Sequence, residues 1–147
     1  MKIIGGIVVL VAVLIIVGQS RSWAGPLTSN QQTAMIARGD GLVIKDIVAG
    51  TGRAAKFGDM LVVNYAGTLT NGVQFDSSYA RREPFRFQLG AGQVIKGWEE
   101  GFEGIKIGGK RELTIPPEMG YGPNAVGPIP PNSVLKFTVE LVDIANQ

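Results

Sequence analysis

The sequence predicts an α+β domain in which a curled antiparallel β-sheet wraps around one short α-helix. Three observations support this prediction: apolar and polar residues alternate in several short segments, glycine and proline are abundant, and a single segment follows a helical period. The chain of 147 residues holds 21 Gly and 8 Pro, and 45% of its residues are apolar. This length and composition suit one globular domain with a substantial core.

The strands are predicted from alternation and from turn residues. Asn71-Gly72 is a strong hairpin signal because both residues tolerate positive φ, and it separates two apolar runs. Pro116-Pro117 ends a later alternating run, since proline cannot continue a sheet ladder. The segments predicted as strands are 42–48, 60–69, 73–77, 85–89, 112–115 and 135–141.

One segment breaks the period of two and follows a helical stripe instead, made by Val94, Ile95, Trp98, Phe102 and Ile105. Three glycines interrupt it, and each costs about 1 kcal/mol against alanine inside a helix. Tertiary packing must therefore hold this helix in place. The acidic residues between the apolar positions, Glu99, Glu100 and Glu103, are expected to form a solvated face rather than an acid/base pair.

The absence of Cys and His limits the chemistry that the chain can perform. It excludes thiol nucleophiles, disulfides and the usual zinc sites, so we expect no metal and no cofactor. Of 14 basic residues, Lys2 and Arg21 lie in the first 24 positions, which leaves 12 basic against 12 acidic residues. A domain with this balance gives no electrostatic reason to expect nucleic acid as a partner.

The N-terminal segment has the pattern of a targeting signal. Residues 3–17 are apolar and uncharged and follow Lys2. As a helix they would span about 22 Å, less than a hydrocarbon core of about 30 Å. Small residues at Ser22 and Ala24 favour cleavage after Ala24, and the alternative is an uncleaved membrane anchor. Either way we expect an exported domain, periplasmic or anchored in the inner membrane and outside the cytoplasm, with only this segment touching the membrane.

The predicted organisation is therefore a signal peptide or anchor at 1–24, a linker or arm at 25–40 and a folded domain at 41–147. The segment 25–38 is polar and small, which is typical of a linker. Within the domain, Gly104-x-x-x-x-Gly109-Lys110 resembles a phosphate-binding loop. Arg111 replaces the required Ser or Thr, so we interpret this segment as the turn between helix and strand.

Several motifs of the domain occur in the order and spacing of a known family. They are Val73-Gln74-Phe75-Asp76-Ser77-Ser78, Pro84-Phe85-Arg86-Phe87, the run from Gly92 to Gly101, Gly120-Tyr121-Gly122 and Ile129-Pro130-Pro131. With these motifs, residues 41–144 resemble an FKBP-type peptidyl-prolyl cis-trans isomerase.

The resemblance implies a shallow apolar pocket with Trp98 as its floor. It assigns ligand donors to the backbone N–H of Ile95 and the hydroxyl of Tyr121, and it makes Asp76 the acid of the pocket. Simple alternation would instead turn Asp76 away from Phe75, and we expect the Tyr121 hydroxyl or a ligand donor to be its partner. The implied lining residues are Tyr65, Phe75, Asp76, Phe85, Val94, Ile95, Trp98, Tyr121, Ile129 and Phe137.

The resemblance further implies isomerisation of Xaa-Pro bonds during the folding of exported proteins, without a nucleophile or metal. The expected partners are proline-containing polypeptides and macrolide immunosuppressants. One departure affects affinity, since the loop 122–128 is about one residue shorter than in the best-known small members and has Ala125 and Val126 where those carry His. The alternatives are a binding module with little catalysis and a dimeric relative with a helical arm. Residues 25–40 are too short for such an arm, so we expect a monomer.

Overall fold

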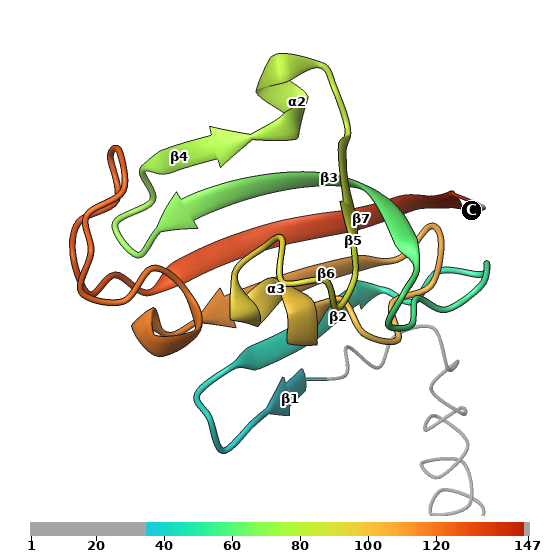
Figure 1. Cartoon of the computed structure of the whole chain (residues 1–147), viewed down its shortest axis with the longest axis horizontal. Helices are drawn as coiled ribbons and strands as arrows, with labels where there is room; N and C mark the ends of the chain where they lie inside the picture. The colour runs from blue at the N-terminus through green and yellow to red at the C-terminus, as the bar shows by residue number, and fades with distance from the viewer. Residues whose placement is uncertain (1–34, 146–147) are drawn as a thin grey trace, which may run out of the picture. The chain divides into compact units, whose positions relative to one another are not determined.

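The computed structural model describes residues 35–145. One antiparallel sheet of seven strands holds this part of the chain together, and its strand order is β1-β2-β6-β7-β3-β4, with β5 paired to β3. Figure 1 shows β7 running along the sheet beside β3 and β6, with α3 against the sheet. The strands are β1 (Met35–Ala37), β2 (Val43–Val48), β3 (Met60–Leu69), β4 (Gln74–Ser77), β5 (Phe85–Gln88), β6 (Lys110–Ile115) and β7 (Leu135–Ala145).

Three short helices complete this part of the chain: α2 (Ser78–Arg81), α3 (Lys96–Gly101) and the 3-10 helix η1 (Pro117–Met119). The predicted α+β fold is confirmed, and β3 has the predicted bounds. The helical stripe is longer than the helix, because α3 begins after Ile95 and ends before Phe102. Trp98, Phe102 and Ile105 are nevertheless buried, so the stripe correctly predicted the side that faces the core.

Strand β1 lies within the segment expected to be a linker or arm. Its three residues pair with β2, as in the register Ile36↔Ile44, so the sheet begins earlier than predicted. Arg38 then forms an ion pair with Glu100 of α3, with 2.9 Å between Nη2 and Oε2. The predicted targeting segment at 1–24 lies outside the described residues. Between residues 35 and 145, the helices are too short or too polar to span a membrane.

The edge of the sheet beside β3 is split into two strands. β5 pairs with residues 60–63 and β4 with residues 66–68, which leaves Asn64 and Tyr65 without a strand partner on that side. The buried hydroxyl of Ser78 fills this gap: its Oγ accepts from the Tyr65 N–H at 2.8 Å and donates to Asn64 Oδ1 at 3.0 Å. Because buried backbone groups need partners, this serine allows α2 to interrupt the edge.

The glycines of α3 bring the helix close to the sheet. A Cβ on Gly97 would lie 2.5 Å from Ile115 Cγ2, and one on Gly101 would lie 2.7 Å from Leu113 Cδ1. Both neighbours belong to β6 and are fully buried. The residues that weaken the helix in isolation therefore permit the packing that holds it.

Arg111 binds the C-terminal end of α3. Its Nη1 donates to the carbonyl oxygens of Gly101 and Glu103 at 2.9 and 2.8 Å, and its Nε donates to Asp46 Oδ1. These bonds satisfy carbonyl groups that a helix leaves unpaired at its C-terminus. The segment that resembles a phosphate-binding loop is thus the turn from α3 to β6, as predicted.

We predict that Gly97→Ala destabilises the protein although alanine is the better helix former. Helix propensity would add about 1 kcal/mol. Over-packing costs about 1–3 kcal/mol or more, and the β-branched Ile115 cannot rotate away easily. We expect a net loss of roughly 2 kcal/mol in the free energy of unfolding, measured by denaturant titration.

Gly39→Ala is the matched control, because a Cβ there meets nothing within 4 Å and the position does not require positive φ. Its effect should stay within about 0.5 kcal/mol. A stabilised Gly97→Ala protein would contradict the close packing of α3.

Candidate active site

A cavity of about 550 Å³ opens beside α3, and all ten residues expected in the pocket line it. They come from β3, β4, β5, the segment before α3, α3 itself, the segment after η1, and β7. The sequence had singled out the loop 122–128 but not its individual lining residues. The further lining residues are Gln93, Val126, Gly127 and Pro128.

Trp98 lies at the centre of an aromatic cluster in this cavity. Its ring meets those of Tyr65, Phe137 and Phe85 edge to face, with centroid distances of 4.9, 5.3 and 6.0 Å. Such contacts are favoured by the ring quadrupoles and fix the orientation of the indole. Trp98 is only 5% exposed, and its Nε1–H has no hydrogen-bond partner among the described residues.

A β-bulge turns Asp76 into the cavity, against the expectation from simple alternation. Gly67 pairs with Asp76 and the next residue, Thr68, pairs with Gln74, so Phe75 is an extra residue in the edge strand. A bulge locally disrupts the ladder and re-aims side chains. As a result Phe75 and Asp76, adjacent in sequence, both line the cavity.

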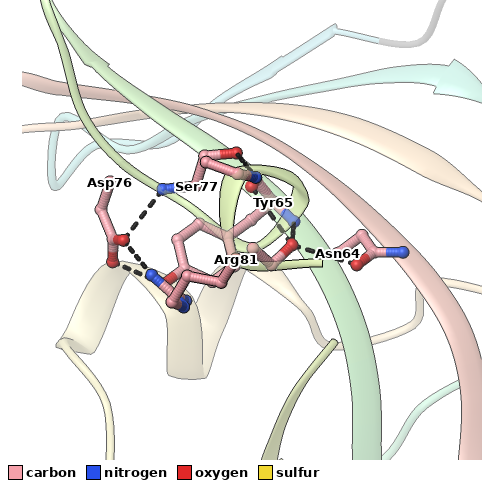
Figure 2. A network of polar contacts seen from close by, with 7 residues as sticks. Asn64, Tyr65, Asp76, Ser77 and Arg81 are labelled. Carbon is pink, nitrogen blue, oxygen red and sulfur yellow. Dashed lines mark hydrogen bonds and ion pairs between the residues drawn. The ribbon is translucent and has the colours of Figure 1, made fainter. Parts of the chain in front are cut away.

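Asp76 is held by Tyr65 and Arg81 rather than by Tyr121, which corrects the expected partner (Figure 2). The Tyr65 hydroxyl donates to Asp76 Oδ2 at 2.5 Å, and Arg81 pairs with Asp76 through Nη1. Arg81 Nη2 also donates to the Tyr65 hydroxyl at 2.7 Å, and the N–H of Ser77 donates to Asp76 Oδ1 at 2.9 Å. Arg81 has no periodic signal in the sequence, because it lies in a helix of four residues.

This network keeps Asp76 ionised at neutral pH. Burial acts to raise the pKa of Asp76, but the hydrogen bonds from Tyr65 and Arg81 and the charge of Arg81 outweigh it, so the pKa lies below its ordinary value. Burial and the bond to Asp76 raise the pKa of Tyr65. Burial, followed by the charge of Asp76, raises the pKa of Tyr121. Both tyrosines are therefore neutral donors near pH 7.

Both donors that the resemblance assigns to ligand carbonyls are, like the Trp98 Nε1–H, without a partner among residues 35–145. The N–H of Ile95 precedes α3, where the backbone is extended with φ −60° and ψ 152°. The Tyr121 hydroxyl is the second, and this side chain is 37% exposed. An apolar cavity with a few convergent donors is the usual form of a ligand site.

The comparison with known families matches this arrangement. The model for FKBP-type peptidyl-prolyl cis-trans isomerase matches residues 51–142, which include most of the sheet and all of the cavity. This chain belongs to that family. An FK506-binding protein of Neisseria meningitidis serogroup B is 55% identical over 105 residues, which are 71% of this chain and 96% of the relative. The FKBP-type isomerase FkpA of Escherichia coli is 54% identical over 104 residues, 71% of this chain and 38% of the relative.

Solved structures confirm the fold of this FKBP-type isomerase. The crystal structure of AtFKBP13 aligns with a TM-score of 0.72 at 40% identity and covers 76% of this chain and 99% of that one. FkpA from Escherichia coli aligns with a TM-score of 0.70 at 49% identity, over 78% of this chain and 53% of that one.

In this FKBP-type isomerase, the loop 122–128 borders one side of the cavity and ends in a tight turn. The N–H of Val126 donates to the oxygen of Ile129 at 3.0 Å, and the N–H of Ile129 donates back at 2.9 Å. Gly127 supplies the positive φ of 51° that this turn needs. The turn brings the apolar side chains of Val126 and Ile129 to the cavity.

We predict that Arg81→Gln raises the pKa of Asp76. The substitution removes the cation and one donor that oppose burial, whereas the bond from Tyr65 remains. The measurement is an NMR titration of the Asp76 carboxyl carbon in wild type and variant. Arg82→Gln is the control, because the side chain of this neighbouring arginine has no polar partner among the described residues. Equal midpoints for wild type and Arg81→Gln would show that Arg81 does not hold Asp76.

Proposed function

We propose that this FKBP-type isomerase binds a prolyl residue over Trp98 in the apolar cavity and accelerates Xaa-Pro isomerisation during the folding of exported proteins. The observation that supports this proposal best is the convergence of the ten expected residues on one cavity. The side chains at its base are aromatic and packed edge to face, and the cavity's one carboxylate already has its partners.

The proposed mechanism is non-covalent. Rotation about a peptide bond has a barrier of about 18–20 kcal/mol, because twisting the amide destroys its resonance. The planar amide is strongly dipolar and well solvated by water, and the twisted amide is less so. Transfer into an apolar cavity therefore disfavours the planar ground state relative to the transition state. Lowering the barrier by about 4 kcal/mol accelerates the reaction roughly a thousandfold.

The unpartnered donors add selectivity for the bound substrate. The Ile95 N–H and the Tyr121 hydroxyl can each donate to a substrate carbonyl, and a donor aimed at the twisted geometry stabilises the transition state preferentially. Asp76 contributes as a fixed charge in the pocket wall rather than as an acid or base. Its bonds to Tyr65 and Arg81 also orient the Tyr65 ring beside Trp98.

The same cavity is proposed to bind macrolide immunosuppressants such as tacrolimus. The matched relatives carry the name FK506-binding protein, and the expected drug-pocket residues line the cavity of this chain. We expect lower affinity than in the best-known small members because the loop 122–128 is shorter. The export of the domain, through a cleaved signal or an anchor, and its monomeric state remain predictions from the sequence.

A binding module that retains the fold but has little catalytic activity is the competing function. We predict that Trp98→Leu lowers kcat/KM for an Xaa-Pro peptide about ten- to hundredfold, or about 1.4–2.7 kcal/mol, and weakens tacrolimus binding. The readouts are NMR exchange for turnover and calorimetry for the drug.

Phe102→Leu is the matched control, since Phe102 is a buried aromatic after the same helix that contacts Trp98 but does not line the cavity. Circular dichroism establishes that both variants are folded. Equal losses of kcat/KM and of tacrolimus affinity in the two variants would show that Trp98 is not part of the binding site. A folded wild-type protein without turnover would favour the binding module.

We further predict a rate that is nearly flat between about pH 6 and 8. The proposed mechanism transfers no proton. The pKa of Asp76 is lowered and the pKa values of Tyr65 and Tyr121 are raised, so all three groups titrate outside this pH range. NMR exchange of a non-titrating peptide measures the profile without a coupling protease. A bell-shaped profile centred near neutrality would point to general acid/base catalysis and overturn the desolvation mechanism.

A further inference from the structure

A second cavity, of about 380 Å³, adjoins the first one. It is lined by Arg81, Glu83, Pro84, Phe85 and Arg86, which belong to the end of α2, the following loop and the start of β5. Phe85 lines both cavities, so the two are neighbours on the surface. An extended peptide advances about 3.3–3.6 Å per residue. Because Phe85 borders both cavities, a peptide with its proline in the first cavity can bring a nearby side chain to the second.

The charges around this second cavity are not balanced within the described part of the chain. Arg81 is already paired with Asp76. The exposed side chains of Arg82, Arg86 and Glu83 have no hydrogen-bond or ion-pair partner among residues 35–145. Residues 82–86 therefore carry two unpaired guanidinium groups and one unpaired carboxylate, which leaves a net positive charge on this segment.

The backbone at Arg82 ends α2, and its N–H donates to the carbonyl oxygens of Ser78 and Tyr79. Its φ of 55° is left-handed, and apart from Asn132 no other non-glycine residue of the described chain has positive φ. Glycine would adopt this conformation at the end of α2 without strain. Arg82 does not itself line the second cavity, but it lies in the sequence between Arg81 and Glu83, which do.

We propose that Arg82 and Arg86 form a subsite for an acidic side chain of the substrate, within three positions of the proline. This specificity rests on the proposed isomerase function. A guanidinium group binds a carboxylate through two parallel hydrogen bonds, so arginine suits Asp and Glu. Glu83 opposes this attraction, so it weakens the preference for an acidic side chain.

The test uses the full chain and a peptide series with one fixed Xaa-Pro core. Glu, Gln or Lys occupies each position from three before to three after the core, and NMR exchange gives kcat/KM. Since exposed ion pairs are individually weak, we expect Glu to exceed Gln by roughly threefold to tenfold at one position, with Lys the poorest. The preference should shrink in 0.5 M salt, because screening weakens exposed pairs.

Variants separate this subsite from general charge effects. Arg82→Gln/Arg86→Gln should bring the Glu-to-Gln ratio to about 1, and Glu83→Gln should raise it above the wild-type value. The control is Lys56→Gln/Lys106→Gln, which removes the same charge from two exposed lysines outside both cavities and should leave the ratio unchanged.

Turnover with equal ratios for Glu and Gln at every position would overturn the subsite and leave the isomerase function intact. So would a control variant that loses the preference as fully as the arginine variant. Absence of turnover with every peptide would overturn the proposed function, and the subsite with it. Thermal melts of each variant establish that the compared proteins are folded.

Discussion

The close approach of α3 to β6 is the constraint on which the site depends. Gly97 and Gly101 have no side chains to hold the helix away from Ile115 and Leu113, so the helix lies directly on the sheet. The same packing places Trp98 in the aromatic cluster, where its ring meets those of Tyr65 and Phe137 edge to face. A helix with glycines at these positions has poor intrinsic stability. Packing against the sheet supplies the stability that the helix lacks, and Trp98 belongs to the buried core.

A second constraint is the split edge beside β3, which brings polar groups to an apolar pocket. The bulge at Phe75 turns Asp76 into the cavity. Where α2 begins, the Ser78 hydroxyl accepts the hydrogen bond from the Tyr65 N–H of β3. At the end of α2, Arg81 forms an ion pair with Asp76. The same interruption creates the loop that carries Arg82. One irregular edge therefore both completes the proposed proline pocket and supplies the charged loop that follows α2.

Regular features of the fold were predictable, and irregular ones were not. Alternation predicted strands such as β7, because one face of it is buried, and the family resemblance implied the residues that line the cavity. The orientation of Asp76 was missed because a bulge has no periodic signature, and Arg81 was missed because α2 has only four residues. Strand β1 is too short to show alternation. Glu99, expected on a solvated face, instead accepts from the N–H groups of Gly90 and Gly92, a loop contact that sequence spacing does not reveal.

The central claim is that the prolyl ring lies on Trp98 while its bond isomerises. The direct measurement is a set of intermolecular NOEs between a peptide with a ¹³C-labelled proline and the indole protons of the full chain. Trp98→Leu identifies the Trp98 signals, since the chain has 2 Trp. The account predicts NOEs from the prolyl ring to Trp98 that tacrolimus removes together with exchange catalysis. Catalysis that persists without NOEs to Trp98, or that survives saturating tacrolimus, would contradict it.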